Sequence, residues 1–249
     1  MRMIRLYCDA PLAAHGLAVI RDDAALHARR VLRLETGDKV VLFNGDGWDY
    51  HGTLAKPQGD RFLPVVLGER SAAAAESPLA LTLVQGISRG DRMDIVLQKA
   101  TELGVARIVP VISERSIVRL DAEQAERKLA HWQGIVIAAC GQCGRARIPE
   151  VAAPIKLDAW LALSRPAGPR LMLALGAKRP LTTAVTGATA VELLIGPEGG
   201  LSSVEQAAAA FVGFEPVLLG PRTLRTETAA IAALAVLQSA AGDLALPPA

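Results

Sequence analysis

Two glycine-proline turns constrain the fold of this chain more than any other feature of its sequence. Residues 193–201 read Leu-Leu-Ile-Gly-Pro-Glu-Gly-Gly-Leu, and residues 217–228 read Val-Leu-Leu-Gly-Pro-Arg-Thr-Leu-Arg-Thr-Glu-Thr. In each, a short apolar run typical of a buried strand stops at a proline, which has no N–H to give to a strand ladder. Because ligands of open α/β sheets bind beyond the carboxyl ends of the strands, the two turns predict a ligand site there.

The region around these turns alternates between strand and helix patterns. Apolar runs predict strands at 79–87, 106–112, 170–175, 191–195 and 214–219, and helical patterns cover 91–103, 121–139, 203–211 and 227–241. Ser202 and Glu205 fit a capping box for the third helix. The alternation predicts an α/β fold with a parallel sheet and helices on both faces. The last helix is apolar nearly all round, so we expect it to be buried in its own domain or against a second subunit.

The first ~70 residues show a different sequence pattern. Short β-like runs at 4–7, 39–43, 50–55 and 62–67 are separated by turn signals, with one helical segment near 22–31. This pattern predicts a small β-barrel or sandwich. Residues 71–78 have no apolar periodicity and end in Ser-Pro, which indicates a linker. We therefore expect a β domain over residues 1–72 and an α/β domain over residues 76–249.

Composition narrows the classes of function. The 249 residues are 51% hydrophobic, enough for a sizeable core, and the net charge of +2 neither requires nor excludes a nucleic-acid partner. No run approaches the ~20 apolar residues that span a bilayer, and no signal peptide is visible. Three cysteines, an odd number, give no disulfide framework. We expect a cytoplasmic protein without a membrane partner.

The sequence lacks the common catalytic and nucleotide-binding motifs, and its one possible metal-binding motif is incomplete. The dinucleotide and Walker phosphate loops, His-Glu-x-x-His and Gly-x-Ser-x-Gly are all absent. Cys140 and Cys143 are spaced as half of a zinc site or as a redox pair. However, the sequence offers no second close pair of ligands, and this pair falls at the end of a helical pattern. A structural turn is the favoured interpretation, and we expect no metal.

The charged residues near the turns suit an anionic ligand or transition state. Glycines allow a backbone to approach a ligand closely, and helix starts offer free N–H groups. Arg222 and Arg225 follow the second turn and are able to clamp a phosphate or offset developing negative charge. In the first domain, Arg5, Arg30 and Arg33 suit a face that contacts phosphates.

Taken together, these motifs resemble the RsmE-type methyltransferases of the SPOUT class. The two turns resemble the signature loops of that family. Residues 90–94 and 98–105 resemble the family's first helix, and residues 113–118 and 142–145 resemble its middle. Residues 5–7, 30–33 and 37–38 resemble its N-terminal domain. The resemblance spans almost the whole chain. It implies S-adenosylmethionine-dependent methylation of N3 of a uridine in small-subunit (16S) ribosomal RNA.

The resemblance also implies an architecture. A PUA-like β-barrel would precede a SPOUT domain with a deep trefoil knot, and the knotted domains would form a homodimer. S-adenosylmethionine would be held by three loops. The residues implied are Leu175, Gly176, Ile195, Gly196, Pro197, Gly199, Gly200, Leu219, Gly220 and Leu224.

Residue roles follow from the resemblance and from the chemistry. Arg222 and Arg225 would orient the base and offset the charge of the uridine anion, and Glu198 or Glu227 would accept the N3 proton. Ribosomal RNA, within the ribosomal particle, would be held by Arg5, Arg30, Arg33 and Arg145.

Besides a redox or zinc protein that would use Cys140 and Cys143, two alternatives stay open. One is a SPOUT enzyme that acts on another RNA or on a ribose 2′-hydroxyl, against which the Arg-Thr-Leu-Arg-Thr-Glu-Thr loop and the two-domain layout argue. The other is a non-catalytic RNA-binding or ribosome assembly factor, against which the intact glycines of both turns argue.

Overall fold

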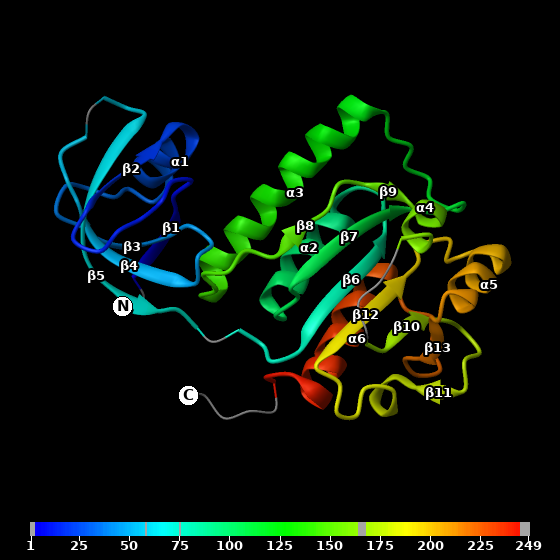
Figure 1. Cartoon of the computed structure of the whole chain (residues 1–249). Coiled ribbons are helices and arrows are strands. Elements are labelled where there is room, and N and C mark those ends of the chain that lie inside the picture. The colour runs from blue at the N-terminus through cyan, green and yellow to red at the C-terminus, as the bar shows by residue number, and fades with distance from the viewer. Residues whose placement is uncertain (1–2, 58, 75, 164–167, 245–249) are drawn as a thin grey trace. The chain divides into compact units, whose positions relative to one another are not determined.

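The computed structural model describes residues 3–57, 59–74, 76–163 and 168–244, and the chain divides into two compact units. Unit 1 is Met1–Glu76 together with Ile137–Ile148, and unit 2 is Ser77–Val136 together with Pro149–Ala249 (Figure 1). The sequence-based division at residues 72 to 76 does not include the second segment of unit 1, because a contact between distant segments leaves no local pattern. Of the predicted linker, Ser71 and Ala72 extend a strand, and Ala75 lies outside the described residues.

Unit 1 is a single curled five-stranded sheet, a half-barrel, where a small β-barrel or sandwich was expected. Its strands run in the order β1-β3-β4-β5-β2, and only the β1–β3 pair is parallel. The bounds are β1 Ile4–Tyr7, β2 Leu17–Arg21, β3 Lys39–Phe43, β4 Trp48–Leu54 and β5 Phe62–Ala72. The sequence patterns missed β2, a short strand that leads directly into helix α1 (Asp22–Leu26). Alternate residues of β2, Ala18 and Ile20, are buried, as a half-buried strand requires.

Unit 2 contains the predicted parallel sheet. Its order is β11-β13-β10-β12-β6-β7-β8, with β9 also paired to β7, and every pair is parallel. The bounds are β6 Ala80–Gly86, β7 Arg107–Ile112, β8 Glu150–Val151, β9 Ile155–Lys156, β10 Arg170–Leu173, β11 Arg179–Pro180, β12 Ala190–Ile195 and β13 Glu215–Leu218. The sequence patterns missed β8, β9 and β11, because two residues are too few to show a period.

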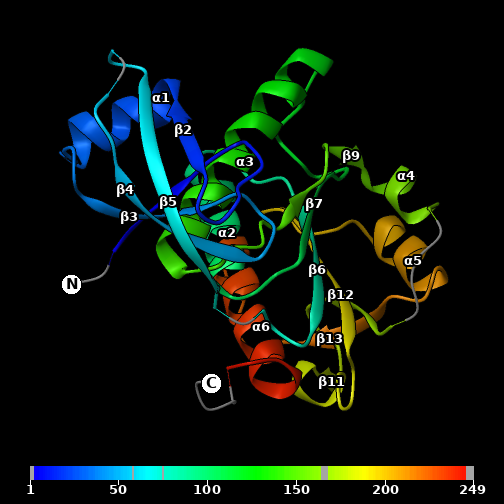
Figure 2. The same ribbon diagram turned by 60° about the vertical axis from the view of Figure 1, so that its left-hand side comes forward.

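Helices cover both faces of this sheet, which confirms the expected layering. The bounds are α2 Asp91–Glu102, α3 Ala122–Cys143, α4 Leu157–Leu161, α5 Ser203–Phe211 and α6 Thr226–Ala241. Helix α2 packs on α6, and α4 packs on α5. Figures 1 and 2 show the first pair on one side of strands β6 and β12 and the second pair on the other. The Ser202–Glu205 capping box is present at the start of α5.

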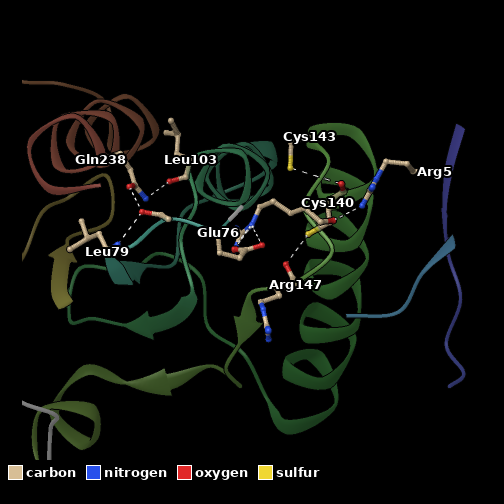
Figure 3. A network of polar contacts seen from close by, with 10 residues as sticks. Arg5, Glu76, Leu79, Leu103, Cys140, Cys143, Arg147 and Gln238 are labelled. Carbon is tan, nitrogen blue, oxygen red and sulfur yellow. Dashed lines mark hydrogen bonds and ion pairs between the residues drawn. The ribbon is translucent and has the colours of Figure 1, made fainter. Parts of the chain in front are cut away.

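The apolar helix α6 is partly buried inside its own unit. Ala230, Ala233, Leu234 and Leu237 are buried. Near the end of the helix, the Gln238 side-chain amide donates to the Leu103 carbonyl at 2.8 Å and accepts from the Ser77 hydroxyl at 2.6 Å (Figure 3). Burial within its own domain, one of the two expectations, is thus confirmed for one side of α6. Among the described residues, no helix has both the length and the apolar character needed to cross a lipid bilayer.

Candidate active site

A cavity lies where three parallel strands of unit 2 end. Strands β10, β12 and β13 run in the same direction, so their carboxyl ends share one edge of the sheet. The segments that follow them line a cavity of ≈ 580 Å³. This volume falls in the range of about 300–1,000 Å³ that is typical of small-molecule sites. The location agrees with the ligand site that the two Gly-Pro turns predict.

The first Gly-Pro loop closes tightly, and glycine is required for it. A Cβ on Gly196 would lie 2.9 Å from the carbonyl carbon of Gly200 and from the nitrogen of Leu201. Gly200 has φ +67°, a left-handed backbone that glycine adopts without strain. At the end of β6, a Cβ on Gly86 would lie 2.4 Å from the nitrogen of Pro197. The loop therefore folds back on itself and packs backbone to backbone against β6.

A chain of polar contacts fastens this loop to the start of α6. The Thr226 hydroxyl donates to the Gly196 carbonyl at 2.9 Å and accepts from the Gln85 side-chain amide at 3.0 Å. Gln85 is fully buried at the end of β6. Three segments far apart in the sequence, β6, the first Gly-Pro loop and α6, thus hold one wall of the cavity.

Of the residues that the structure describes, six with charged side chains line the cavity, and four of them are arginines. They are Arg92, Arg115, Arg222, Arg225, Glu198 and Glu227. Arg222 and Arg225 come from the second Gly-Pro loop, as predicted. Sequence reasoning missed Arg92 and Arg115, which follow β6 and β7. The rule that ligands bind beyond the carboxyl ends of parallel strands would have found both, because β6 pairs with β12 and β7 pairs with β6 in the same parallel sheet.

The carboxylate of Glu198 already accepts two hydrogen bonds from within the protein. Its Oε1 accepts the backbone N–H of Arg89 at 3.0 Å and a guanidinium N–H of Arg92 at 2.7 Å. Partial burial raises the pKa of Glu198, but the hydrogen bonds from the backbone and the Arg92 cation outweigh burial and leave that pKa below its ordinary value. A carboxylate with a lowered pKa is a poor proton acceptor near neutral pH. The structure therefore argues against Glu198 as the base and shows it joining the start of α2 to the first Gly-Pro loop.

The ten residues expected to bind the cofactor gather at this cavity with one exception. Gly176, with φ +80° in the loop after β10, is the member that does not line it. The members that do are Leu175, Ile195, Gly196, Pro197, Gly199, Gly200, Leu219, Gly220 and Leu224. On the β10 side, the cavity wall is formed by Leu173, the last residue of the strand, and by Ala174 and Leu175, which follow it.

The predicted RNA-binding arginines fall into two groups, and Arg5 and Arg145 require a correction. The Arg5 side chain is 8% exposed, forms an ion pair with Asp49 and donates to the Arg145 carbonyl at 2.9 Å (Figure 3). The Arg145 side chain is 9% exposed, and its Nε lies 3.0 Å from Glu76 Oε2. Both guanidinium groups are buried and paired within unit 1, so they do not present a surface to RNA.

Arg30 and Arg33 are exposed on unit 1, as an RNA-contacting role requires. Helix α1 continues as a π-helical turn, His27–Val31, which carries Arg30 with 69% of its side chain exposed. Arg33 is exposed just after this turn and has a left-handed backbone with φ 55°. Such irregular segments are frequent at functional sites.

Cys140 and Cys143 lie in the last turn of helix α3. The Cys140 thiol donates to the Arg147 carbonyl at 3.7 Å, and the Cys143 thiol donates to the Cys140 carbonyl at 3.9 Å (Figure 3). Burial raises the pKa of the Cys140 thiol to about 12. Across the described ranges, no group of three His, Cys, Asp or Glu side chains is placed to hold a metal ion. The reactive form of a cysteine is the thiolate, which Cys140 does not reach at neutral pH.

This environment predicts the outcome of thiol labelling. Treated with iodoacetamide at pH 8, the folded protein should leave Cys140 unmodified, and unfolding in urea should expose it to complete reaction. Peptide mass spectrometry measures the extent at each cysteine, and the partly exposed Cys143 serves as the internal comparison. Rapid labelling of native Cys140 would restore the redox interpretation.

Comparisons with known proteins agree with the geometry. The model of a family described as an RNA methyltransferase domain matches residues 75–238, and that of an RNA methyltransferase PUA domain matches residues 20–66. The chain is 32% identical over 243 residues to the ribosomal RNA small subunit methyltransferase E of Buchnera aphidicola, and the match covers 98% of each protein.

Solved structures are similar over the same length. One is the ribosomal RNA small subunit methyltransferase E of Neisseria gonorrhoeae bound to S-adenosyl methionine, with a TM-score of 0.88 and 37% identity over 98% of this chain and 100% of that one. Another is a protein from Legionella pneumophila in complex with SAM, with a TM-score of 0.92 and 40% identity over 98% and 100%.

Proposed function

This chain belongs to the RNA methyltransferase family, and we propose that it methylates N3 of a uridine in small-subunit ribosomal RNA with S-adenosylmethionine as donor. The single observation that carries this proposal is the cavity at the carboxyl ends of β10, β12 and β13, closed by glycines that the fold requires and lined by arginines.

The residues of the cavity fit S-adenosylmethionine. When bound, this cofactor supplies a methyl group that its sulfonium has already activated. The glycines of the first Gly-Pro loop let backbone N–H and C=O groups approach a ligand closely, which suits an adenine and a ribose. Apolar side chains of Leu175, Ile195 and Leu224 supply the hydrophobic part of the lining. Such a mixture of apolar walls and a few fixed polar groups is typical of cofactor sites.

The arginines of the same cavity suit the chemistry at the acceptor. N3 of uridine loses a proton as it is methylated, so negative charge develops on the base. Arg222 and Arg225 are exposed and line the cavity, and in this proposal they orient the base and offset that charge. A target base in structured RNA must first leave its stack, and the open side of the cavity would receive it.

Unit 1 would hold the surrounding RNA. Residues 1–72 form the PUA-like domain of this proposal, and the exposed Arg30 and Arg33 are its candidate phosphate contacts. Residues 76–249 form the SPOUT domain. We also propose that the SPOUT domain contains a trefoil knot, that the protein is a homodimer, and that it acts on the ribosomal particle in the cytoplasm. The family to which the chain belongs supports these four properties.

Removal of the two exposed arginines should separate RNA binding from cofactor binding. The double variant Arg30→Ala, Arg33→Ala should weaken binding of small-subunit RNA about tenfold at low salt and reduce its salt dependence, because two phosphate contacts are lost. Affinity for S-adenosylmethionine should stay unchanged. Fluorescence anisotropy over a salt series measures the first quantity and calorimetry the second. A matched variant, Arg127→Ala with Lys128→Ala on α3, removes the same charge elsewhere, and equal weakening by both would contradict a specific face.

Methyl transfer tests the function itself. Purified protein, S-adenosylmethionine with a labelled methyl group and ribosomal subunits that lack the modification are combined, and label is followed in each RNA. The proposal requires incorporation into small-subunit RNA and none into large-subunit RNA. Cofactor binding without any methyl transfer to RNA would favour an RNA-binding or assembly factor.

A further inference from the structure

We propose that Glu227 is the residue that takes the N3 proton from the target uridine, an assignment that rests on the proposed function and names a catalytic residue for it. Glu227 lies in the first turn of α6 and lines the cavity together with Arg222 and Arg225. It is one of two carboxylates in that lining.

The contacts of Glu227 leave its carboxylate available. Its side chain is 14% exposed, and its Oε2 is buried with no hydrogen-bond partner among the described residues. Its Oε1 lies 4.0 Å from Arg92 Nε, an ion pair too long for a hydrogen bond. Buried polar atoms are nearly always hydrogen-bonded, so a carboxylate oxygen without a partner inside a ligand cavity calls for an incoming donor. The N–H of a bound uridine is such a donor.

The second carboxylate of the cavity does not compete for this role. Glu198 already accepts hydrogen bonds from the Arg89 backbone and from Arg92, which lower its pKa. Arg92 thus binds Glu198 directly and reaches Glu227 only at the longer distance. One arginine at the start of α2 therefore holds one carboxylate and leaves the other able to move toward substrate.

The proton transfer balances with the methyl transfer. The N3–H bond breaks and its proton goes to a carboxylate oxygen of Glu227. The electron pair left on N3 forms the bond to the methyl carbon, and the electrons of the carbon–sulfur bond stay on sulfur, which becomes a neutral thioether. Glu227 then gives its proton to water. Arg92, Arg115, Arg222 and Arg225 are the cations that line the same cavity, and Glu198 is the other anion.

The pH profile of Glu227→Gln tests the assignment. Positioned proton transfer contributes about 100-fold or more, so turnover at pH 7 should fall about 100-fold. Without a base, the reaction depends on uridine that is already ionised, so turnover of the variant should rise tenfold with each pH unit where the wild-type rate is level. Glu227→Asp should recover part of the rate. Calorimetry should show unchanged binding of S-adenosylmethionine, and Glu123→Gln on the surface of α3 should behave as wild type.

Each other outcome overturns the assignment. Near-normal turnover of Glu227→Gln beside an active wild-type protein would remove Glu227 from catalysis and leave the proposed function intact. Lost cofactor binding in a folded Glu227→Gln protein would make Glu227 a cofactor contact instead of the base. Absence of RNA methylation by the wild-type protein would overturn the proposed function and this assignment with it.

Discussion

Gly196→Val should abolish measurable binding of S-adenosylmethionine. A Cβ at this position would lie 2.9 to 3.0 Å from three backbone atoms of Gly200 and Leu201, and backbone has no room to yield there. The loop would open, the Thr226 hydroxyl would lose its acceptor, and the cavity wall would move. Calorimetry measures the effect, with micromolar binding (~8 kcal/mol) expected for the wild type.

Two further glycine variants separate a local effect of the Gly196 loop from a general effect of adding a side chain. Gly200→Ala meets no atom within 4 Å but requires a left-handed alanine at φ +67°, so it should fold and bind the cofactor more weakly. Gly134→Ala, in the middle of α3 with no neighbour within 4 Å, should bind normally and stabilise the protein by about 0.5–1 kcal/mol. Normal cofactor binding by a folded Gly196→Val protein would remove the first Gly-Pro loop from the site.

Arg222→Ala should lower turnover by about 100-fold to 1,000-fold, the usual cost of removing one group that stabilises developing negative charge. The side chain is exposed at the cavity, so its removal should leave folding and cofactor affinity unchanged. Single-turnover methylation measures the rate, and calorimetry and anisotropy measure binding of cofactor and RNA. Arg222→Lys should recover little, because an ammonium lacks the planar fork of donors.

A matched arginine controls for charge alone. Arg127 on α3 is 65% exposed and pairs with Glu123 four residues before it, so Arg127→Ala should keep nearly full turnover. If Arg222→Ala kept near-normal turnover at normal RNA affinity, its catalytic role would be wrong.

Local patterns predicted the parts of the fold that are locally determined. The strands that end at Gly196-Pro197 and Gly220-Pro221 were found because apolar runs and prolines mark them in sequence. Helix α5 was found with its bounds, because Ser202 and Glu205 cap it. The site followed from one further rule, that parallel strands present their carboxyl ends at a common edge.

The errors concern long-range partners, which no local pattern records. Arg5 and Arg145 have the residue type of RNA-binding positions, but Asp49 and Glu76 pair with them inside unit 1. Likewise, Glu198 and Glu227 are indistinguishable in sequence. Only the packing of α2 against α6 brings Arg92 to one of them at 2.7 Å and to the other at 4.0 Å.

The nucleoside product of the reaction identifies the methylated atom. Small-subunit RNA treated with the wild-type protein and S-adenosylmethionine is digested to nucleosides and analysed by mass spectrometry against authentic standards. We expect one new product, N3-methyluridine, which should be absent when the protein is Gly196→Val. A 2′-O-methylated nucleoside, or a methylated base other than uridine, would contradict the assigned chemistry, and unmodified RNA from a protein that binds the cofactor would contradict the assigned reaction.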